Sequence, residues 1–142
     1  HWGDEYSRHA NRHQIELAKK AIQAGADLIV GTHPHVLQEF KMVTDQGVKS
    51  VPVFYSLGNF FNWSINKEGT SSSVIAQIEM EYFDGRFNTK KVTAIPIAAN
   101  NKRIQNLHQR ALIFVKKDDL SWQRELDSIE KSIPKEILLF MN

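Results

Sequence analysis

Two β-rich segments on either side of an Asp84-Gly85 pair constrain the fold more than any other feature of this chain. In residues 74–82, apolar side chains at every second position alternate with polar ones, which predicts a half-buried strand. An Asp-Gly pair favours the two-residue turn of a β-hairpin, and residues 87–98 supply the partner strand. We therefore expect an antiparallel sheet here, with residues 111–115 as one more strand.

The first half of the chain has a different pattern, a helix followed at once by a strand. Residues 7–24 carry apolar side chains at helical spacing, with Ser7 as the expected N-cap and Gly25 as the expected C-terminal stop. Residues 27–30 form a short apolar run that predicts a buried strand of an α/β unit. Two further strands are expected at residues 36–43 and 48–57, on either side of a turn at 45–47. A second helix is expected at residues 118–133, where Pro134 stops it.

Composition excludes several classes of protein. Hydrophobic residues make up 42% of the 142 and charged residues 24%, which is typical of one globular domain and not of a disordered chain. No apolar run approaches the roughly 18 to 20 residues that a membrane-spanning helix needs. There is no cysteine, so disulfides, thiolate metal sites and cysteine nucleophiles are excluded. We expect residues 1–142 to belong to a single domain.

The charges are unevenly distributed although the formal net charge is only +2. Residues 86–117 contain no Asp or Glu but eight basic residues: Arg86, Lys90, Lys91, Lys102, Arg103, Arg110, Lys116 and Lys117. Such a stretch can attract a polyanion, or it can be a solvated sheet face whose lysines discourage edge-to-edge pairing. Nucleic acid is not expected as a partner, because the stretch lacks regularly spaced aromatic residues that stack on bases.

The strongest candidate for chemistry is Gly31-Thr32-His33-Pro34-His35, which directly follows the strand predicted at residues 27–30. Ligands of open α/β sheets bind beyond the carboxyl ends of the strands. Pro34 disfavours helical geometry at His33, and in an extended segment His33 and His35 would point the same way. Two such imidazoles can converge on one metal ion or on a pair of ions. Alternatively, both are ordinary exposed loop residues, as we expect for His9, His13 and His108.

Two further clusters of polar and aromatic residues accompany this motif. Residues 1–6 combine an imidazole, two carboxylates and two aromatic rings, which either form part of a site or are only terminal polar residues. Residues 55–61 follow a predicted strand and can place Ser56 or Asn59 at the same sheet edge, although a Gly-Asn pair can also be only a turn. Ser56 is not expected to be a nucleophile, because no Gly-x-Ser-x-Gly motif surrounds it.

In this order and spacing, residues 1–6, 24–36 and 55–60 resemble the CapA family of bacterial capsule (poly-γ-glutamate) synthesis proteins. The resemblance covers roughly the first sixty residues. It implies membership of the calcineurin-like metallophosphoesterase superfamily and an α/β (α+β) fold. In that superfamily a two-sheet sandwich is flanked by helices and holds a two-metal site at the ends of its strands.

The resemblance also implies roles for individual residues. His1, His33 and His35 match metal-ligand histidines, and Glu5 and Asn59 match family motif positions that make them candidate catalytic residues. The expected cofactors are divalent metal ions, with manganese, iron or zinc as the possibilities. An aspartate-bearing strand and an Asn-His motif of the family should precede His1, so we expect this chain to be the C-terminal half of the domain. The N-terminal half is then its first expected partner and completes the metal site.

Three hypotheses about function follow. In the first, the complete protein is a phosphoesterase whose metal ions activate water. In the second, it is a non-catalytic subunit that handles poly-γ-glutamate together with capsule synthase subunits at the outer face of the bacterial membrane. The third, an amidohydrolase-like His-x-His site, does not suit the order of elements, because that family needs a complete barrel. We favour a role in capsule synthesis and leave catalysis open.

Overall fold

The computed structural model describes residues 1–45, 49–60, 67–100, 103–104, 107–108 and 111–141. Three strands form the first sheet in the order β1-β3-β2, and three form the second in the order β4-β5-β8. The elements are α1 (Arg12–Gln23), β1 (Ile29–Val30), β2 (Phe40–Asp45), β3 (Lys49–Phe54), β4 (Ser72–Phe83), β5 (Arg86–Asn100), β6 (Arg103–Ile104), β7 (Leu107–His108), β8 (Ala111–Phe114) and α2 (Gln123–Ser132), with short 3₁₀ helices at Leu120–Trp122 and Lys135–Ile137. The expected mixed α/β fold class is confirmed.

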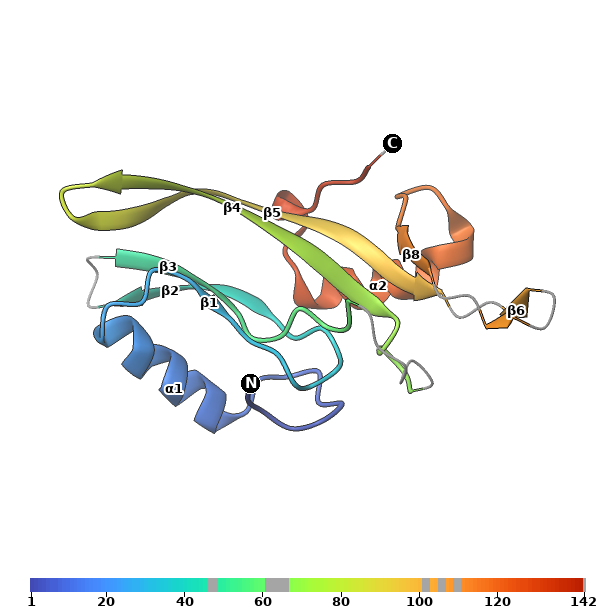
Figure 1. Ribbon diagram of the computed structural model, residues 1–142, viewed down its shortest axis with the longest axis horizontal. Coiled ribbons are helices and arrows are strands. Elements are labelled where there is room, and N and C mark those ends of the chain that lie inside the picture. The colour runs from blue at the N-terminus through green and yellow to red at the C-terminus, as the bar shows by residue number, and fades with distance from the viewer. Residues whose placement is uncertain (46–48, 61–66, 101–102, 105–106, 109–110, 142) are drawn as a thin grey trace.

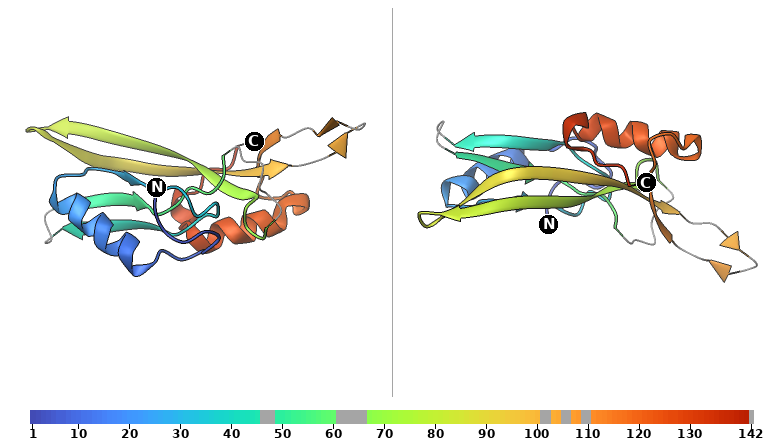
Figure 2. Two further views of the ribbon diagram at one scale, coloured as in Figure 1. Left: turned by 60° about the horizontal axis from the view of Figure 1, so that its bottom comes forward. Right: turned by 90° about the horizontal axis from the view of Figure 1, so that it is seen from above.

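The two sheets and α1 form three layers (Figures 1 and 2). On one face of the first sheet, Ala18 and Ile22 of α1 pack against Val51, Val53 and Tyr55. The opposite face packs against the second sheet and α2, through a core formed by Leu37, Phe40, Phe54, Val74, Ala94, Ile129 and Ile133. β2 and β3 therefore pack apolar side chains on both faces of the sheet, as expected for a covered sheet.

The long hairpin follows the sequence prediction closely. β4 and β5 pair antiparallel, from Ser72 opposite Ala98 to Phe83 opposite Arg86, and β8 extends the sheet by pairing with β5. Asp84 and Gly85 have φ values of 49° and 75°, the two positive angles that a type I′ turn requires. A bulge between Glu79 and Met80 shifts the register once.

The predicted start of the first helix is wrong. α1 begins at Arg12, and its N-cap is Asn11, whose side-chain oxygen accepts a hydrogen bond from the Gln14 backbone. Asn11 and Gln14 form a reciprocal capping box, which outcompetes Ser7, whose hydroxyl donates to the His9 carbonyl instead. The predicted stop is confirmed: Gly25 follows the C-cap with a φ of 104°.

The strand predicted as buried at residues 27–30 is also different in the structure. β1 contains only Ile29 and Val30, and Val30 is 46% exposed. β1 pairs in parallel with β3 and lies at the edge of the sheet, because no described strand pairs with its other side. The next two strands pair as expected but are shorter than predicted. Asp45, the first residue of the turn predicted at 45–47, is instead the last residue of β2, and residues 46–47 lie outside the described residues.

The last predicted helix begins later than expected. A 3₁₀ turn capped by Asp119 precedes α2, which spans residues 123–132. Leu126, Ile129 and Ile133 are buried as the periodicity predicted. α2 packs against β4 and β5 (Figure 1), and its Ile129 belongs to the core that the two sheets share.

Candidate functional site

The His-Pro-His segment lies where the sequence predicts it, directly after β1. Its backbone bends sharply through residues 33–36, and the N-terminal segment (residues 1–10) holds it there. The Trp2 N–H donates to the carbonyl of Thr32 at 3.1 Å, and the Tyr6 N–H donates to that of Pro34 at 2.8 Å. These bonds bring two of the predicted clusters together, although they are about thirty residues apart in the chain.

The three predicted metal-ligand histidines lie close to one another. The ring centroids of His1 and His33 are 4.3 Å apart, and those of His33 and His35 are 6.2 Å apart. His33 and His35 are half-buried and His1 is exposed. His9 and His13 are exposed elsewhere, as predicted, and the side chain of His108 lies outside the described residues. We call His1, His33 and His35 the histidine group.

The extended geometry expected for the two histidines is wrong. Their φ values are +104° at His33 and +61° at His35, and that of Tyr6 beside them is +63°. Asp84 in the hairpin turn is the only other non-glycine residue with positive φ in the described chain. Such conformations cost about 1–3 kcal/mol each and persist only where surrounding contacts enforce them. Here the hydrogen bonds from the N-terminal segment override the local preference that Pro34 imposes.

Asn59 fixes the orientation of His35. Its Oδ1 lies 2.9 Å from Nδ1 of His35, and its Nδ2 donates to the Thr70 carbonyl at 3.1 Å. The Thr70 contact assigns Nδ2 as the donor, so Oδ1 faces the ring and accepts a hydrogen bond from the Nδ1–H of His35. A neutral imidazole protonated on Nδ1 carries its lone pair on Nε2. Metal-binding histidines are commonly oriented by such a hydrogen bond on their other nitrogen.

Tyr6 and Lys67 form one side of the histidine group. The Tyr6 ring is stacked on His35 with a centroid distance of 6.1 Å, and Nζ of Lys67 lies 3.7 Å from the Tyr6 ring centroid. A cation over a tyrosine face is attracted by the negative face of the ring. Lys67 was not predicted from the sequence, because it follows a polar stretch that carries no motif.

Glu5 and Ser56 have different surroundings from the histidines. Glu5 is exposed in the turn before Tyr6, adjacent in sequence to a residue of the site. Ser56 is buried, and its Oγ accepts a hydrogen bond from the Gly58 N–H at 3.2 Å.

Trp2 attaches the N-terminal segment to the sheet. Its Nε1 donates to the Tyr55 carbonyl at 2.8 Å, and the two rings stack with centroids 5.9 Å apart. Gly31 is required at this contact, because a Cβ atom there would overlap the Tyr55 carbonyl and the Trp2 indole nitrogen. Burial, with a smaller contribution from the Glu39 charge, raises the pKa of the Tyr55 hydroxyl above its ordinary value.

The described residues do not complete a metal site by themselves. No three His, Asp or Glu side chains among them are grouped so that they could hold an ion. The histidine group supplies imidazole nitrogen, a donor type that suits zinc and iron, but a two-metal centre also needs bridging carboxylates. The donor chemistry therefore fits part of a divalent metal site.

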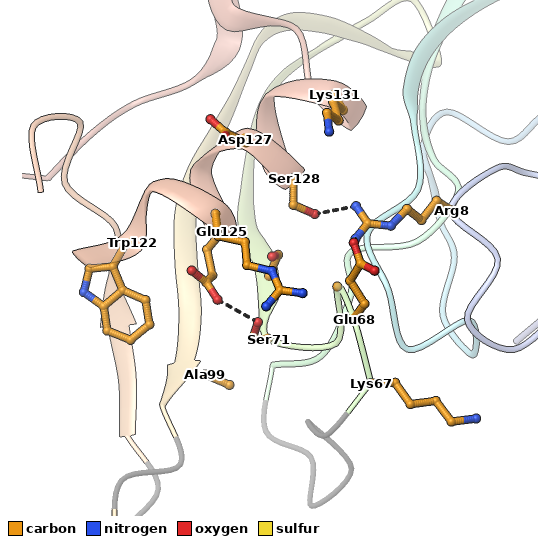
Figure 3. A pocket seen from close by; sticks show the side chains of 13 residues that line it. Arg8, Lys67, Glu68, Ser71, Ala99, Trp122, Glu125, Asp127, Ser128 and Lys131 are labelled. Carbon is orange, nitrogen blue, oxygen red and sulfur yellow. Dashed lines mark hydrogen bonds and ion pairs between the residues drawn. The ribbon is translucent and has the colours of Figure 1, made fainter. Parts of the chain in front are cut away.

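A separate pocket of about 450 Å³ lies between α2, Arg8 and residues 67–72 (Figure 3). Arg8 donates from Nη1 to the Ser128 hydroxyl at 2.9 Å and pairs with Glu68 at 3.3 Å. The basic residues that line the pocket are Arg8, Lys67, Arg124 and Lys131, and the acidic ones are Glu68, Glu125 and Asp127. Lys67 borders both this pocket and the histidine group.

The basic stretch at residues 86–117 is partly neutralised by its neighbours. Lys90 pairs with Glu81 at 2.6 Å, and Lys91 with Glu79 at 3.9 Å, both across the β4–β5 hairpin. All four side chains are more than half exposed, so these pairs add little stability. Two of the eight basic residues thus face carboxylates that are distant in sequence. Within the described residues, no helix is long and apolar enough to cross a membrane.

Comparison with known proteins supports the resemblance found in the sequence. Residues 1–64 match the family described as "Bacterial capsule synthesis protein PGA_cap". The capsule biosynthesis protein CapA of Bacillus anthracis is 49% identical over 71 residues, which are 48% of this chain and 16% of that protein. The PGA biosynthesis protein CapA of Bacillus subtilis (strain 168) is 31% identical over 131 residues, 88% of this chain and 32% of that protein.

The second relative extends the similarity well beyond the three clusters, into the β4–β5–β8 sheet and α2. The matched region is nevertheless at most a third of the length of either CapA protein. The family match and both relatives therefore agree on one assignment: this chain belongs to the CapA family of bacterial capsule synthesis proteins.

Proposed function

We propose that the histidine group is part of a divalent metal site in a capsule-synthesis protein with a metallophosphoesterase-like fold. One observation carries the proposal: His1, His33 and His35 lie together, and the backbones of His33 and His35 are held in left-handed conformations by contacts from the N-terminal segment. Strain of this kind is typical of sites where positioning matters more than stability. Membership of the CapA family agrees with it.

The proposal gives each residue a role. Imidazoles of the histidine group hold the ion, with Nε2 as the donor atom of His35, and Asn59 keeps that ring in its tautomer. Asn59 is then a positioning residue and not a catalytic one. When bound, a divalent metal would act as a Lewis acid on an anionic oxygen of a ligand. Glu5 stays a candidate catalytic residue, because it is exposed and directly precedes Tyr6 in the sequence.

The remaining ligands would come from another part of the complete gene product. β1 is the edge of its sheet, and Val30 is half exposed, which suits a further parallel strand beside it. We propose that an N-terminal half of the domain supplies this neighbour together with the carboxylates. A location outside the cytoplasmic membrane, with capsule synthase subunits as partners, is part of the same proposal.

The test is a double variant of the complete gene product, His33→Ala/His35→Ala. We expect it to lose bound zinc, iron or manganese, measured by elemental analysis after purification. The matched control is His9→Ala/His13→Ala, which removes two exposed imidazoles outside the group and should retain the metal. Equal metal content in both variants would contradict the proposal. Hydrolysis of an aryl phosphate, measured on the same samples, decides whether the site is also catalytic.

A second candidate function, binding of a polyanion such as poly-γ-glutamate, is favoured by the pocket in Figure 3. Arg124 and Lys131 lie on one face of α2, where they line this pocket without an acidic partner among the described residues. Such binding should weaken as salt is added, because exposed charges are screened over about 10 Å at 0.1 M.

The polyanion hypothesis is tested by charge reversal at the pocket. We expect Arg124→Glu/Lys131→Glu to lose retention of the polymer on an affinity column, whereas Lys19→Glu/Lys20→Glu changes the same amount of charge at exposed positions on α1. The hypothesis is abandoned if both variants retain the polymer equally. A loss in both would indicate only a general effect of net charge.

A further inference from the structure

Two completely buried glutamines, Gln14 on α1 and Gln38 before β2, lie beneath the N-terminal segment. Nε2 of Gln14 donates to Oε1 of Gln38 at 2.8 Å. A buried amide is costly unless its polar atoms are hydrogen-bonded. Two glutamines buried in this way therefore require specific partners.

Those partners belong to the segment that carries His1 and Tyr6. Nε2 of Gln38 donates to the carbonyl oxygens of Ser7 and His9, at 2.9 and 3.1 Å. Oε1 of Gln14 accepts from the Asn11 N–H at 3.0 Å. The two amides thus connect helix α1 to three backbone groups of residues 7–11.

The segment is also held at Gly3 and Asp4. Gly3 has a φ of +83°, and a Cβ atom there would lie 2.5 Å from Oε1 of Gln14, so its backbone lies directly against the glutamine amide. The Asn11 side chain donates to Asp4 at 2.9 Å. Along the N-terminal segment, residues that contact the glutamines or the helix cap therefore alternate with Trp2 and Tyr6, which bond to the His-Pro-His segment.

We infer that Gln14 and Gln38 are positioning residues for the histidine group. They hold residues 3–11 in the path that places His1 against His33 and Tyr6 against His35. An apolar pair of similar size would fill the space, but it would remove the Gln38 donor from the Ser7 carbonyl and leave the His9 carbonyl with the Ser7 hydroxyl alone. The inference rests on the proposed function only in taking the histidine group as a metal site.

The first measurement is hydrogen exchange in the metal-free protein. In Gln38→Leu we expect the Trp2 and Tyr6 amides to exchange at least about tenfold faster, because their segment is no longer held, while amides of β4 are unchanged. Gly3→Ala should also speed the exchange of the Trp2 and Tyr6 amides, because its Cβ atom would displace the Gln14 amide. The control is Ile97→Val, a mild change of a buried side chain in the second sheet.

The second measurement is Zn²⁺ binding to the complete gene product by calorimetry. We expect Kd to rise at least about tenfold in Gln38→Leu and Gly3→Ala and to stay unchanged in Ile97→Val. Wild-type exchange rates at Trp2 and Tyr6 in folded Gln38→Leu would overturn the inference, as would faster exchange with unaltered Zn²⁺ affinity. If Gln38→Leu does not fold, Gly3→Ala decides by the same criteria. If the wild type binds no Zn²⁺, the proposed function fails, while the exchange result still decides whether the glutamines hold the segment.

Discussion

Oδ1 of Asn59 and Nδ1 of His35 lie 2.9 Å apart, although one residue follows β3 and the other follows β1. β1 and β3 are parallel neighbours, so the segments after their carboxyl ends meet at the same sheet edge. This contact joins the His-Pro-His segment to the cluster at residues 55–61, and the Trp2 and Tyr6 backbone bonds join the cluster at residues 1–6 to the same segment. The site is therefore a product of the sheet topology.

Replacement of Asn59 with Ala should weaken both the fold and the site. The side chain is buried and bonded to His35 and to the Thr70 carbonyl, so we expect the free energy of unfolding to fall by about 1–3 kcal/mol. Zn²⁺ affinity should fall about 10–100-fold, because His35 loses the acceptor that fixes its tautomer. Urea unfolding and calorimetry measure the two effects. Asn88→Ala, at an exposed position of β5, should change neither.

At position 33 a Gly variant should be more stable than an Ala variant, which is the reverse of the usual order of stability. At a φ of +104° an L side chain is strained, so His33→Gly should be more stable than His33→Ala by about 1 kcal/mol. Both variants remove the imidazole and should bind metal equally poorly. Urea unfolding of the same pair at His13, inside α1, provides the comparison, since there Ala should be more stable than Gly by about 1 kcal/mol. The same order at both positions would show that the His33 backbone is not strained.

Regular periodicity and turn chemistry allowed much of the fold to be predicted. Alternation in residues 74–82 and the Asp84-Gly85 pair both express constraints within a few neighbouring residues, and the hairpin has the predicted turn. The grouping of His1, His33 and His35 was also expected, from the family resemblance.

The errors arose where distant contacts decide the structure. Local rules favour an extended His33, but hydrogen bonds from Trp2 and Tyr6 impose a left-handed bend. The start of α1 depends on which of several polar residues completes a capping box, and Asn11 has Gln14 three residues on. Gln38 and Lys67 carry no sequence motif, because their partners come from other segments.

Gly31→Ala should release the N-terminal segment. The added Cβ atom would overlap the Tyr55 carbonyl and the Trp2 indole nitrogen, so the hydrogen bond between them cannot persist. We expect a loss of about 1–3 kcal/mol in the free energy of unfolding, the typical cost of overpacking a buried site. Trp2→Phe removes the same hydrogen bond without the overlap. If Trp2 is the contact that matters, the double variant should be less destabilised than the sum of the two single ones.

Tyr55 should make the protein sensitive to alkali. Burial, assisted by the nearby Glu39 charge, raises the pKa of its hydroxyl above 10.0, so the folded state retains this proton at a pH where the unfolded chain has released it. The resulting stability is fully present below about pH 10 and is lost as the pH rises through 10 towards the folded-state pKa. Urea unfolding between about pH 8 and 11 should therefore show a steeper loss in the wild type than in Tyr55→Phe. Glu39→Gln, which removes the smaller cause, should lie between the two, and equal slopes in all three proteins would refute the assignment.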